Sequence, residues 1–385
     1  MVHAHEKLPG FYKALTPFIN HCSSAGMPVN DRCSICPPSD DISTLFTSAG
    51  MQRYRKHFDL KNNFGISQAA SIQPCLRMDD LNKVGDGQHL TFFYMLGTFG
   101  FGSNNYTEHC TLWDHIIRDL GVRIDYVRVH PKAPLEHYGI WAYLGYSIVK
   151  DSDCVWGIQG EATSYCCELM HCTGIDLEPD VEVGNLVNTN GNSVDVGFGF
   201  ERILQVTGHH RLIDQSFVFN KNLDPISRDH VRALEALRET DIQPGDKGRD
   251  FVCRNLLRRV LRRQPDGALK DYNFYDWVAP ERERMEQSLA RANDAYPMHK
   301  NESAEWWHDS FGLTPDEVDK LTLPEADLLT TSIEDALKGR LAFKKVGNFL
   351  AADQIRNELT GRGVHVFDIK GTTKWSYKDA SGIIE

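Results

Sequence analysis

The sequence predicts an α+β fold, because a hairpin of strand-like segments occurs in the same 385-residue chain as segments with helical periodicity. Residues 89–102 are rich in aromatic and β-branched residues, and a polar turn that contains glycine joins them to the preceding segment at 75–81. Residues 193–206 contain two alternating glycines followed by an apolar helical pattern. Residues 8–26 carry apolar side chains at helical spacing and end at a glycine. We therefore expect a hairpin, a strand that leads into a helix, and an N-terminal helix.

Length and composition indicate a globular protein with more than one domain. At 385 residues the chain exceeds one typical core, so two or three domains are expected. Hydrophobic residues make up 41% and charged residues 25%, which is ordinary for globular proteins. No run reaches the roughly 18 apolar residues of a membrane span, and the first residues lack the regions of a signal peptide. The expected location is the cytoplasm, with no membrane partner.

Net charge and cysteine content narrow the possible partners. A net charge of −11 argues against unspecific attraction to nucleic acid, although a local basic face is compatible with it. The ten cysteines are expected to be buried thiols, as is usual in a reducing compartment. A less favoured alternative is a zinc site, because thiolate and imidazole are the usual zinc ligands. Its candidate ligands are Cys33, Cys36, Cys166, Cys167, His171 and Cys172.

The stretch at residues 193–206 has the strongest chemical implication. Glycine has no Cβ, so its two glycines let a flat molecule approach the backbone closely. Arg202 begins the helical pattern and can stack on a planar ring or pair with phosphate oxygens. Asp195 precedes it on the strand and can hold an ammonium group. An acid for an amine and an arginine for a nucleotide suit a site that joins an amino acid to ATP. The alternative is a surface helix with an ordinary Glu201–Arg202 pair.

The hairpin has two interpretations as well. Arg77 on its first strand and an aromatic residue on its second strand could hold a nucleotide from both sides. Alternatively, the aromatic side chains of the second strand belong to the core.

Nine short motifs, taken together, resemble a known family. They are Leu45-Phe-Thr-Ser-Ala-Gly-Met51, Cys75-Leu-Arg77, Thr91-Phe-Phe-Tyr-Met-Leu-Gly97, Ser152-Asp153 before Trp156, Asn185-Leu-Val187, Val194-Asp-Val-Gly-Phe-Gly-Phe-Glu-Arg202, Asp229-His-Val-Arg232, the basic segment Arg249 to Arg263, and Trp307-His-Asp-Ser-Phe-Gly312. In this order they resemble alanyl-tRNA synthetase, a class II synthetase, over roughly residues 10–320. One motif alone is weak evidence, whereas nine in the family's order are hard to obtain by chance.

The resemblance implies a fold and three domains. Residues 1–218 would form a class II synthetase catalytic domain, an antiparallel sheet flanked by helices. Residues 219–332 would form a helical domain like the start of the family's tRNA-recognition region. Residues 333–385 would form a small tail, which is similar to the end of cysteinyl-tRNA synthetase in the motifs between Arg340 and Trp375. That tail could grip RNA or, as we prefer, pack as a cap on the catalytic domain. The chain as a whole resembles a truncated, specialised relative of the family.

The resemblance also implies roles for individual residues, each by its position in a motif. Arg77 and Arg202 would be catalytic, with Arg77 on the α-phosphate of ATP and Arg202 over the adenine. The ATP-binding residues would be Arg77, Phe93, Glu182, Gly199 and Arg202, and Glu182 would also bind Mg²⁺. The residues that bind the amino acid would be Met51, Trp156, Asn185, Asp195 and Gly197, with Asp195 on the ammonium group. Those that bind tRNA would be Arg249, Arg258, Arg259 and Arg262, unless this basic helix is an ordinary solvated face.

Several departures from the family pattern limit these inferences. The segment after Arg77 is shorter than usual and lacks a Gly-Gly-Lys-His run. Tyr94 replaces a glutamate, which weakens the inferred contact with adenine. Gly184 stands where a tryptophan is usual, which is expected to enlarge the pocket. Asp246 and Gly248 replace asparagines used for acceptor-stem reading. Alanine is therefore the first expected substrate, with another small amino acid as its competitor.

Two classes of function follow from the resemblance. The first is an AMP-forming ligase that makes an aminoacyl adenylate from ATP and transfers the acyl group to tRNA, a carrier protein, a peptide or a small-molecule amine. The second is a non-catalytic synthetase relative that acts as a binding or regulatory module. The joint presence of the implied pocket residues favours the enzyme.

Overall fold

The computed structural model describes most of the chain, which forms two compact units, Met1–Ala279 and Pro280–Glu385. The described residues are 9–58, 65–102, 105–157, 164–174, 180–189, 193–208, 222–319, 321, 325–345, 349–361, 363–369, 372–377 and 380–384.

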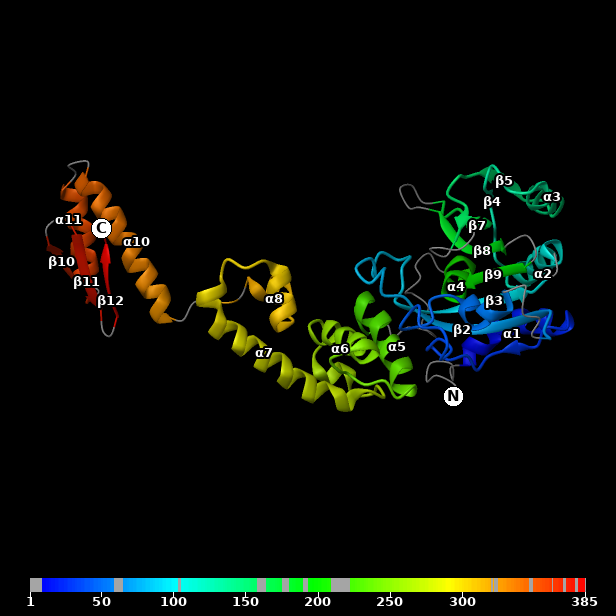
Figure 1. Ribbon diagram of the computed structural model, residues 1–385, viewed down its shortest axis with the longest axis horizontal. Helices are drawn as coiled ribbons and strands as arrows, with labels where there is room; N and C mark the ends of the chain where they lie inside the picture. The colour runs from blue at the N-terminus through cyan, green and yellow to red at the C-terminus, as the bar shows by residue number, and fades with distance from the viewer. Residues whose placement is uncertain are drawn as a thin grey trace. The chain divides into compact units, whose positions relative to one another are not determined.

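A mainly antiparallel sheet organises the first unit (Figure 1). Among the described residues it has nine strands, in the order β1-β2-β3-β9-β8-β7-β4-β5, with β6 paired to β7. The outer pairs β1–β2 and β4–β5 are parallel, and the pairs between them are antiparallel. The strands are β1 (Val29–Asn30), β2 (Gln68–Leu76), β3 (Phe92–Gly100), β4 (Tyr126–Val129), β5 (Ser147–Lys150), β6 (Val155–Trp156), β7 (Ser164–His171), β8 (Val181–Thr189) and β9 (Ser193–Gly199). The predicted α+β class with an antiparallel sheet is confirmed.

The predicted hairpin is formed by β2 and β3, which pair in antiparallel register over nine residues each. Arg77, expected on the first strand, lies one residue beyond the end of β2. Its backbone N–H still donates to the Thr91 carbonyl oxygen at 2.9 Å, so the pairing of the hairpin continues to this point. The arginine is therefore held at the end of the hairpin where the connecting turn begins.

Two helices, α1 (Pro9–Ser24) and α2 (Tyr106–Asp119), cover one face of the sheet. The Trp113 ring of α2 stacks on Phe198 of β9, with centroids 3.9 Å apart and planes 7° apart. Phe18 of α1 packs on the same tryptophan at 5.5 Å. These fully buried aromatic rings form the core on that face and leave the opposite face for a site. The helix predicted near the N-terminus is α1.

The remaining helices of the first unit pack beside the hairpin and at the edges of the sheet. Asp229 of α5 accepts hydrogen bonds from the backbone N–H groups of Thr91 and Phe92, at 2.9 and 3.4 Å. This contact is one reason why α5 and α6 belong to the same compact unit as the sheet. The domain boundaries expected after residues 218 and 332 stay predictions. The helices are the 3₁₀ helix Gly50–Phe58, α3 (Leu135–Tyr143), α4 (Phe200–Gly208), α5 (Pro225–Glu239), α6 (Gly248–Leu261) and two 3₁₀ turns, Asp266–Leu269 and Tyr275–Trp277.

The second unit contains two apolar clusters, each formed by neighbouring parts of the chain. One surrounds the buried Trp307 ring, and the other surrounds the buried Trp375 ring in the tail. In the tail, Arg340 of α10 donates both Nη groups to the Asp368 carboxylate of β10, at 2.9 and 2.7 Å. This pair holds the helix on the tail's three-stranded antiparallel sheet. The elements are α7 (Val278–His299), α8 (Ala304–Phe311), α9 (Pro315–Val318), α10 (Glu325–Lys345), α11 (Phe349–Gly361), β10 (His365–Ile369), β11 (Thr372–Tyr377) and β12 (Ala380–Ile384).

Candidate active site

A cavity of about 210 Å³ opens on the face of the sheet that α2 does not cover. Successive residues of a strand point to opposite faces. Because Phe198 points toward α2, its neighbours Gly197 and Gly199 face the other way, into the cavity. Seven residues with predicted roles line this cavity: Arg77, Phe93, Glu182, Asn185, Gly197, Gly199 and Arg202.

Two arginines border the cavity, and each is held by a few contacts. Nε of Arg77 donates to the Ser48 carbonyl oxygen at 2.9 Å, and its guanidinium lies 5.0 Å from the centre of the Phe93 ring. Nη1 of Arg202 donates to the carbonyl oxygen of Glu182 at 2.8 Å and to its carboxylate at 3.2 Å. Both arginines keep N–H groups that no described residue accepts. These donors suit an anion such as a phosphate.

A bulge in β8 brings two predicted residues to the same face of the sheet. In a regular strand, residues three apart such as Glu182 and Asn185 point to opposite faces. Here consecutive residues of β7 pair with Gly184 and Glu182, so Val183 is an extra residue in β8. One extra residue reverses the alternation of the strand. Glu182 and Asn185 therefore both line the cavity.

The glycines of β9 line the cavity with backbone and add no side chains of their own. A Cβ at Gly197 would lie 3.0 Å from the Met95 sulfur, which is closer than side chains normally pack. A Cβ at Gly199 would make ordinary contact with the Arg202 side chain at 3.5 Å. The missing side chains at these glycines make room for the Met95 and Arg202 side chains, and the close approach of a flat molecule stays a prediction.

Gly184 does not enlarge the cavity in the way that the sequence suggested. A Cβ at this position would lie 2.4 Å from the Phe198 ring, on the side of the sheet that faces α2. The missing side chain therefore makes room for an aromatic ring in the core rather than for a ligand.

Tyr94 also lies away from the cavity. Its side chain is buried and packs edge-on against Phe11 and Phe92, at 5.2 and 5.4 Å. Phe93, its neighbour in β3, lines the cavity. The tyrosine is a core residue, so the replacement seen in the sequence changes the core and leaves the Phe93 ring in place.

Asp195 lies on the cavity face of β9, two residues before Gly197, although it does not line the 210 Å³ cavity itself. Its neighbours across the sheet are Phe99 and Val187, both fully buried. Within the described part of the chain no hydrogen bond reaches its carboxylate. Burial raises the pKa of Asp195 to about 7. An unpaired, desolvated carboxylate of this kind is suited to a cationic ligand.

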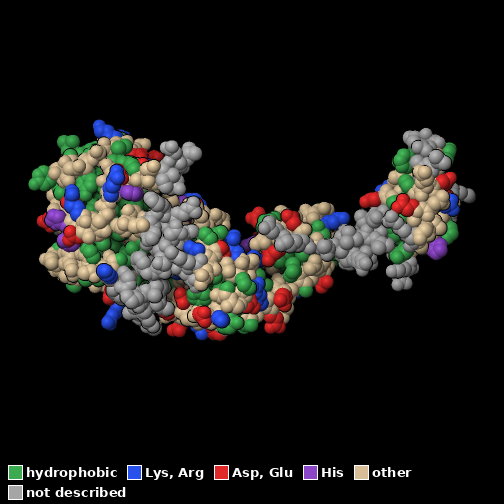
Figure 2. Space-filling model, turned by 180° about the vertical axis from the view of Figure 1, so that it is seen from behind, with side chains coloured by type: hydrophobic (Ala, Val, Ile, Leu, Met, Phe, Trp, Pro, Cys, Tyr) green, Lys and Arg blue, Asp and Glu red, His purple; other side chains and the backbone are tan. Residues whose placement is uncertain are grey.

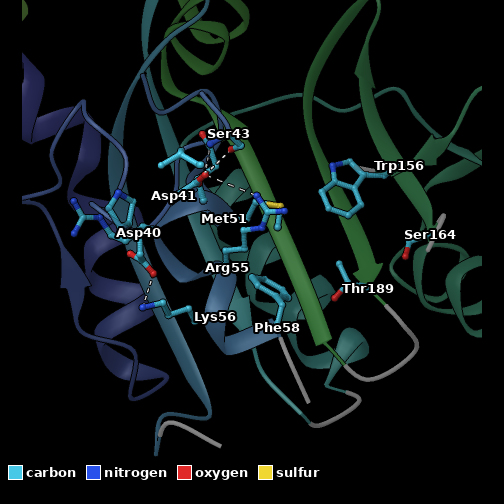
Figure 3. Close-up of a pocket in the computed structure, with 14 residues that line it drawn as sticks. Asp40, Asp41, Ser43, Met51, Arg55, Lys56, Phe58, Trp156, Ser164 and Thr189 are labelled. Carbon is cyan, nitrogen blue, oxygen red and sulfur yellow. Dashed lines mark hydrogen bonds and ion pairs between the residues drawn. The ribbon is translucent and has the colours of Figure 1, made fainter. Parts of the chain in front are cut away.

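Met51 and Trp156 line a second cavity of about 800 Å³. Figure 3 shows Met51, Arg55 and Phe58 on one side of it and Trp156 on the other. Met51 and Phe99 belong to one apolar cluster, against which Trp156 packs. Because Phe99 lies opposite Asp195, this aspartate is placed between the residues of the two cavities. The predicted residues for the amino acid are thus divided: Met51 and Trp156 line the second cavity, Asn185 and Gly197 line the first, and Asp195 lines neither.

Sequence reasoning missed several charged residues of both cavities. Arg55 lies 3.8 Å from Asp41, and Lys56 pairs with Asp40 (Figure 3). The basic run in the last turn of the 3₁₀ helix was visible in the sequence, but nothing in its pattern indicated a cavity. His89 of the first cavity was missed as well, because it directly precedes an aromatic strand and has no motif of its own.

Glu182 fits the expected requirements for Mg²⁺. This ion keeps much of its water and is bound by one or two carboxylates together with substrate phosphates. The other glutamate of the cavity, Glu201, is engaged by the Tyr94 backbone N–H at 3.0 Å and by Arg232 at 2.6 Å. Glu182 has one described ion pair, with Arg202, and borders the same cavity.

The basic helix α6 uses some of its predicted RNA-binding arginines inside the protein. Arg259 is partly buried and donates to the His230 ring at 3.0 Å and to the Leu81 carbonyl oxygen at 3.3 Å. Arg249 donates to the Leu45 carbonyl oxygen at 2.6 Å. Arg258 and Arg262 are partly exposed. On the described surface visible in Figure 2, acidic and basic side chains are interspersed rather than gathered into one basic area.

The surface pair suggested for Glu201 and Arg202 does not form. Glu201 pairs with Arg232 and Arg202 pairs with Glu182. All ten cysteines are free, and eight of them are buried. Among the described residues, Cys33 and Cys36 belong to no group of three metal-ligating side chains. The described part of the chain therefore does not bring Cys33 and Cys36 together with the other candidate zinc ligands, although Cys166 belongs to a different group of metal-ligating side chains.

Comparisons with known proteins bear on this arrangement. Residues 15–150 match the family model of the tRNA synthetases class II (A). Alanine–tRNA ligase of Endomicrobium trichonymphae is 28% identical over 305 residues, which cover 63% of this chain and 34% of that protein. The enzyme of the same name from Ehrlichia canis (strain Jake) is 29% identical over 321 residues, which cover 67% of this chain and 35% of that protein. The chain contains an alanine–tRNA-ligase-like region.

This alanine–tRNA-ligase-like region corresponds to only part of its relatives. Alanine–tRNA ligase of Francisella tularensis subsp. tularensis is 25% identical over 377 residues, which cover 83% of this chain and 41% of that protein. The chain thus spans 34–41% of the length of these relatives. Among solved structures, S. aureus histidyl-tRNA synthetase matches with 12% identity and a TM-score of 0.39, covering 66% of this chain and 85% of that one. No described helix has the length and apolar character needed to cross a membrane.

Proposed function

We propose that this protein activates a small amino acid, alanine first, with ATP to form an aminoacyl adenylate, and then transfers the acyl group to an acceptor. The observation that carries the proposal is that Arg77, Phe93 and Arg202 border one cavity. Two guanidinium groups and an aromatic ring around one cavity suit a nucleotide. The similarity to class II synthetases and alanine–tRNA ligases gives independent support.

In the proposed reaction the amino-acid carboxylate attacks the α-phosphorus of ATP. A carboxylate–phosphorus bond forms, the bond to the bridging oxygen breaks, and pyrophosphate leaves. The attacking carboxylate is already ionised, so the site needs no general base. Catalysis then rests on positioning and charge stabilisation, which the N–H donors of Arg77 supply as negative charge develops on the phosphate. Glu182 would hold Mg²⁺, which neutralises charge on the phosphates when bound.

The amino acid would lie over β9, with its ammonium group on Asp195. Asn185 and Gly197 pair with each other across β8 and β9, beside Asp195, and both border the nucleotide cavity. This placement would bring the amino-acid carboxylate toward the α-phosphate. A bound ammonium group would stabilise the ionised form of Asp195 and so reverse the effect of burial on its pKa.

Two kinds of acceptor remain in the proposal. A tRNA acceptor is supported by the similarity to alanine–tRNA ligases. The internal contact of Arg259 and the exposed Asp246 on the preceding turn favour a non-tRNA acceptor, such as a carrier protein, a peptide or a small-molecule amine. The runner-up function is a non-catalytic relative that binds ATP or an amino acid and regulates another protein.

Amino-acid-dependent exchange between ATP and pyrophosphate tests the proposed activation. We expect exchange with alanine, and a loss of at least a hundredfold in Asp195→Asn, because an amide cannot replace the charge that holds the ammonium group. Asp119→Asn, at an exposed carboxylate, is the control and should exchange like the wild type. No exchange with any small amino acid would favour the regulatory alternative, and unaltered exchange in Asp195→Asn would refute the assigned contact.

The acceptor can be separated from the activation step. Labelled alanine, ATP and the protein are incubated with and without total tRNA, and acid-precipitable label is measured. Label that requires tRNA and is removed by ribonuclease identifies tRNA as the acceptor. Label on protein without tRNA identifies a carrier or peptide.

A further inference from the structure

Cys154, Cys166 and Glu168 form a group of metal-ligating side chains outside the nucleotide cavity. Their ligand atoms, two sulfurs and a carboxylate oxygen, all lie within 4.8 Å of one another. Both cysteines are buried, and the glutamate is partly buried. None of the three has a role in the proposed activation of an amino acid.

The backbone holds these side chains together. Cys154 directly precedes β6, and its carbonyl oxygen accepts a hydrogen bond from the Cys166 backbone N–H at 3.1 Å. Cys166 and Glu168 are two residues apart in β7, so they point to the same face of the sheet. Cys167 between them points the other way, where its sulfur accepts a hydrogen bond from the Tyr106 hydroxyl at 2.9 Å. The group is therefore fixed by strand pairing rather than by side-chain rotation alone.

We propose that Cys154, Cys166 and Glu168 bind one Zn²⁺ ion. Zinc takes thiolate and carboxylate ligands in a tetrahedron, with Zn–S bonds of about 2.3 Å, which corresponds to donor separations of roughly 3.8 Å. The separations found here are compatible with that geometry after small adjustments of the side chains. Three protein donors leave a fourth position for water, as in zinc sites that remain open.

The charges around the group suit a bound cation. Two thiolates and one carboxylate carry three negative charges, so a divalent ion leaves one negative charge. Arg128 lies 3.7 Å from one carboxylate oxygen of Glu168 and is placed to offset it. Without an ion, the hydrogen bond with the Cys166 thiol and burial raise the pKa of Cys154. Binding would release the protons of both thiols, because only thiolates ligate zinc.

The ion would join β6 to β7 beside the second cavity. Cys154, Cys166 and Val187 form an apolar cluster against which Trp156 packs. The two-residue strand β6 is otherwise held by its pairing with β7. A zinc ion here would fix the position of Trp156 at the cavity wall. The zinc site itself does not depend on the proposed function, since metal content is measured without any substrate.

Metal content of the full-length protein tests the proposal. Protein purified under reducing conditions without chelator should contain about one zinc per chain, released on denaturation and detected by elemental analysis. Replacement by Co²⁺ should give the intense thiolate-to-metal absorption bands of a site with two sulfur ligands. A wild-type protein that contains no stoichiometric zinc, takes up none on titration and shows no such bands with Co²⁺ would overturn the proposal, without the need for any variant.

Variants identify the ligands. Cys154→Ser and Cys166→Ser should each weaken zinc binding by at least about tenfold, and Glu168→Gln should weaken it while the thiolate bands of Co²⁺ remain. Cys36→Ser and Cys172→Ser, at partly exposed cysteines outside the group, should bind like the wild type. Full binding in both ligand-cysteine variants would contradict the assignment. A Cys154–Cys166 disulfide in protein kept under reducing conditions, found by mass spectrometry together with an absence of zinc, would also overturn it.

Discussion

Arg202 and Arg232 both pair with a glutamate, but in very different surroundings. Arg232 of α5 is 3% exposed and donates to Glu201 at 2.6 Å, while that glutamate also accepts the Tyr94 backbone N–H. Arg202 of α4 is 32% exposed and contacts Glu182 at 3.2 Å, beside the cavity. The first pair joins α5, α4 and β3 inside the protein, whereas the second leaves N–H groups available to a ligand.

The difference shows that two adjacent residues, Glu201 and Arg202, can serve stability and ligand binding separately. Glu201 and Arg202 are adjacent at the start of α4, where side chains of successive residues point about 100° apart. One therefore turns into the core and the other toward the cavity. A buried pair is costly to break because it leaves an unpaired charge, whereas an exposed pair contributes little to stability. Replacement of Arg232 should thus mainly reduce stability, and replacement of Arg202 should mainly reduce activity.

The largest effect is expected at Arg232. Arg232→Met leaves the Glu201 carboxylate buried without its partner, so the free energy of unfolding should fall by about 3–5 kcal/mol. Urea denaturation followed by circular dichroism measures this change. Arg238→Met on the same helix is the control, since its pair with Asp276 is solvent-exposed and should be worth no more than about 1 kcal/mol. Equal effects of the two substitutions would remove the distinction between the buried and the exposed pair.

Arg202→Ala should show the opposite behaviour. We expect stability within about 1 kcal/mol of the wild type, and a loss of roughly 100- to 1,000-fold in pyrophosphate exchange, the usual cost of removing one preorganised donor. Exchange kinetics and urea denaturation on the same preparation separate the two quantities. Thr207→Ala, on the exposed end of α4, should leave the exchange rate unchanged. A destabilised but fully active Arg202→Ala protein would show that this arginine supports the fold.

Gly184→Ala tests whether a side chain at this position points into the core or into the cavity. The added Cβ would lie 2.4 Å from the Phe198 ring, so crowding should lower the free energy of unfolding by about 1–3 kcal/mol. The KM for ATP should change little, because the new methyl group points away from the cavity. A stable variant with a strongly raised KM would instead place this methyl group on the cavity side.

The smallest effect concerns pH. Burial raises the pKa of Asp195 from its usual value to about 7, so below pH 7 the free protein holds this carboxyl protonated. The ammonium group needs the carboxylate, so the KM for alanine should fall by up to about tenfold per pH unit as pH rises toward 7, and then level off. The KM for ATP over the same range is the internal control. An alanine KM that does not vary between pH 6 and 8 would contradict this role for Asp195.

The raised pKa of Asp195 makes stability fall as pH rises, whereas alanine binding should improve. Between pH 4 and 7 the folded state holds a proton on Asp195 that the unfolded state has released, so the wild type loses stability as pH rises through this range. Asp195→Asn should not show this loss. Thermal unfolding at pH 5 and pH 8 compares the two proteins.

Local patterns predicted the elements that carry the site. The hairpin and the step from β9 to α4 were visible in the sequence, because aromatic strands and glycine pairs are local features. Arg77, Phe93 and Arg202 line one cavity, as expected for residues assigned to a single nucleotide site. Their chemical roles stay predictions.

Features that depend on distant parts of the chain could not be predicted. The Glu201–Arg232 pair joins two helices, and Arg259 contacts a residue 178 positions away. The burial of Asp195 depends on the strands on either side of it. Gly184 was misinterpreted because the direction of its missing side chain depends on the pairing of three strands.

The bulge at Val183 decides which polar side chains of β8 reach the cavity. If Val183 were instead paired as a regular member of the β8 ladder, Glu182 would turn toward the aromatic core, on the far side of the sheet from the proposed nucleotide site. A related protein with the equivalents of Glu182 and Asn185 three residues apart would need the same bulge to place both on the cavity face, whereas a spacing of two residues would do so in a regular strand. In this strand, the spacing between the polar residues matters as much as their identity.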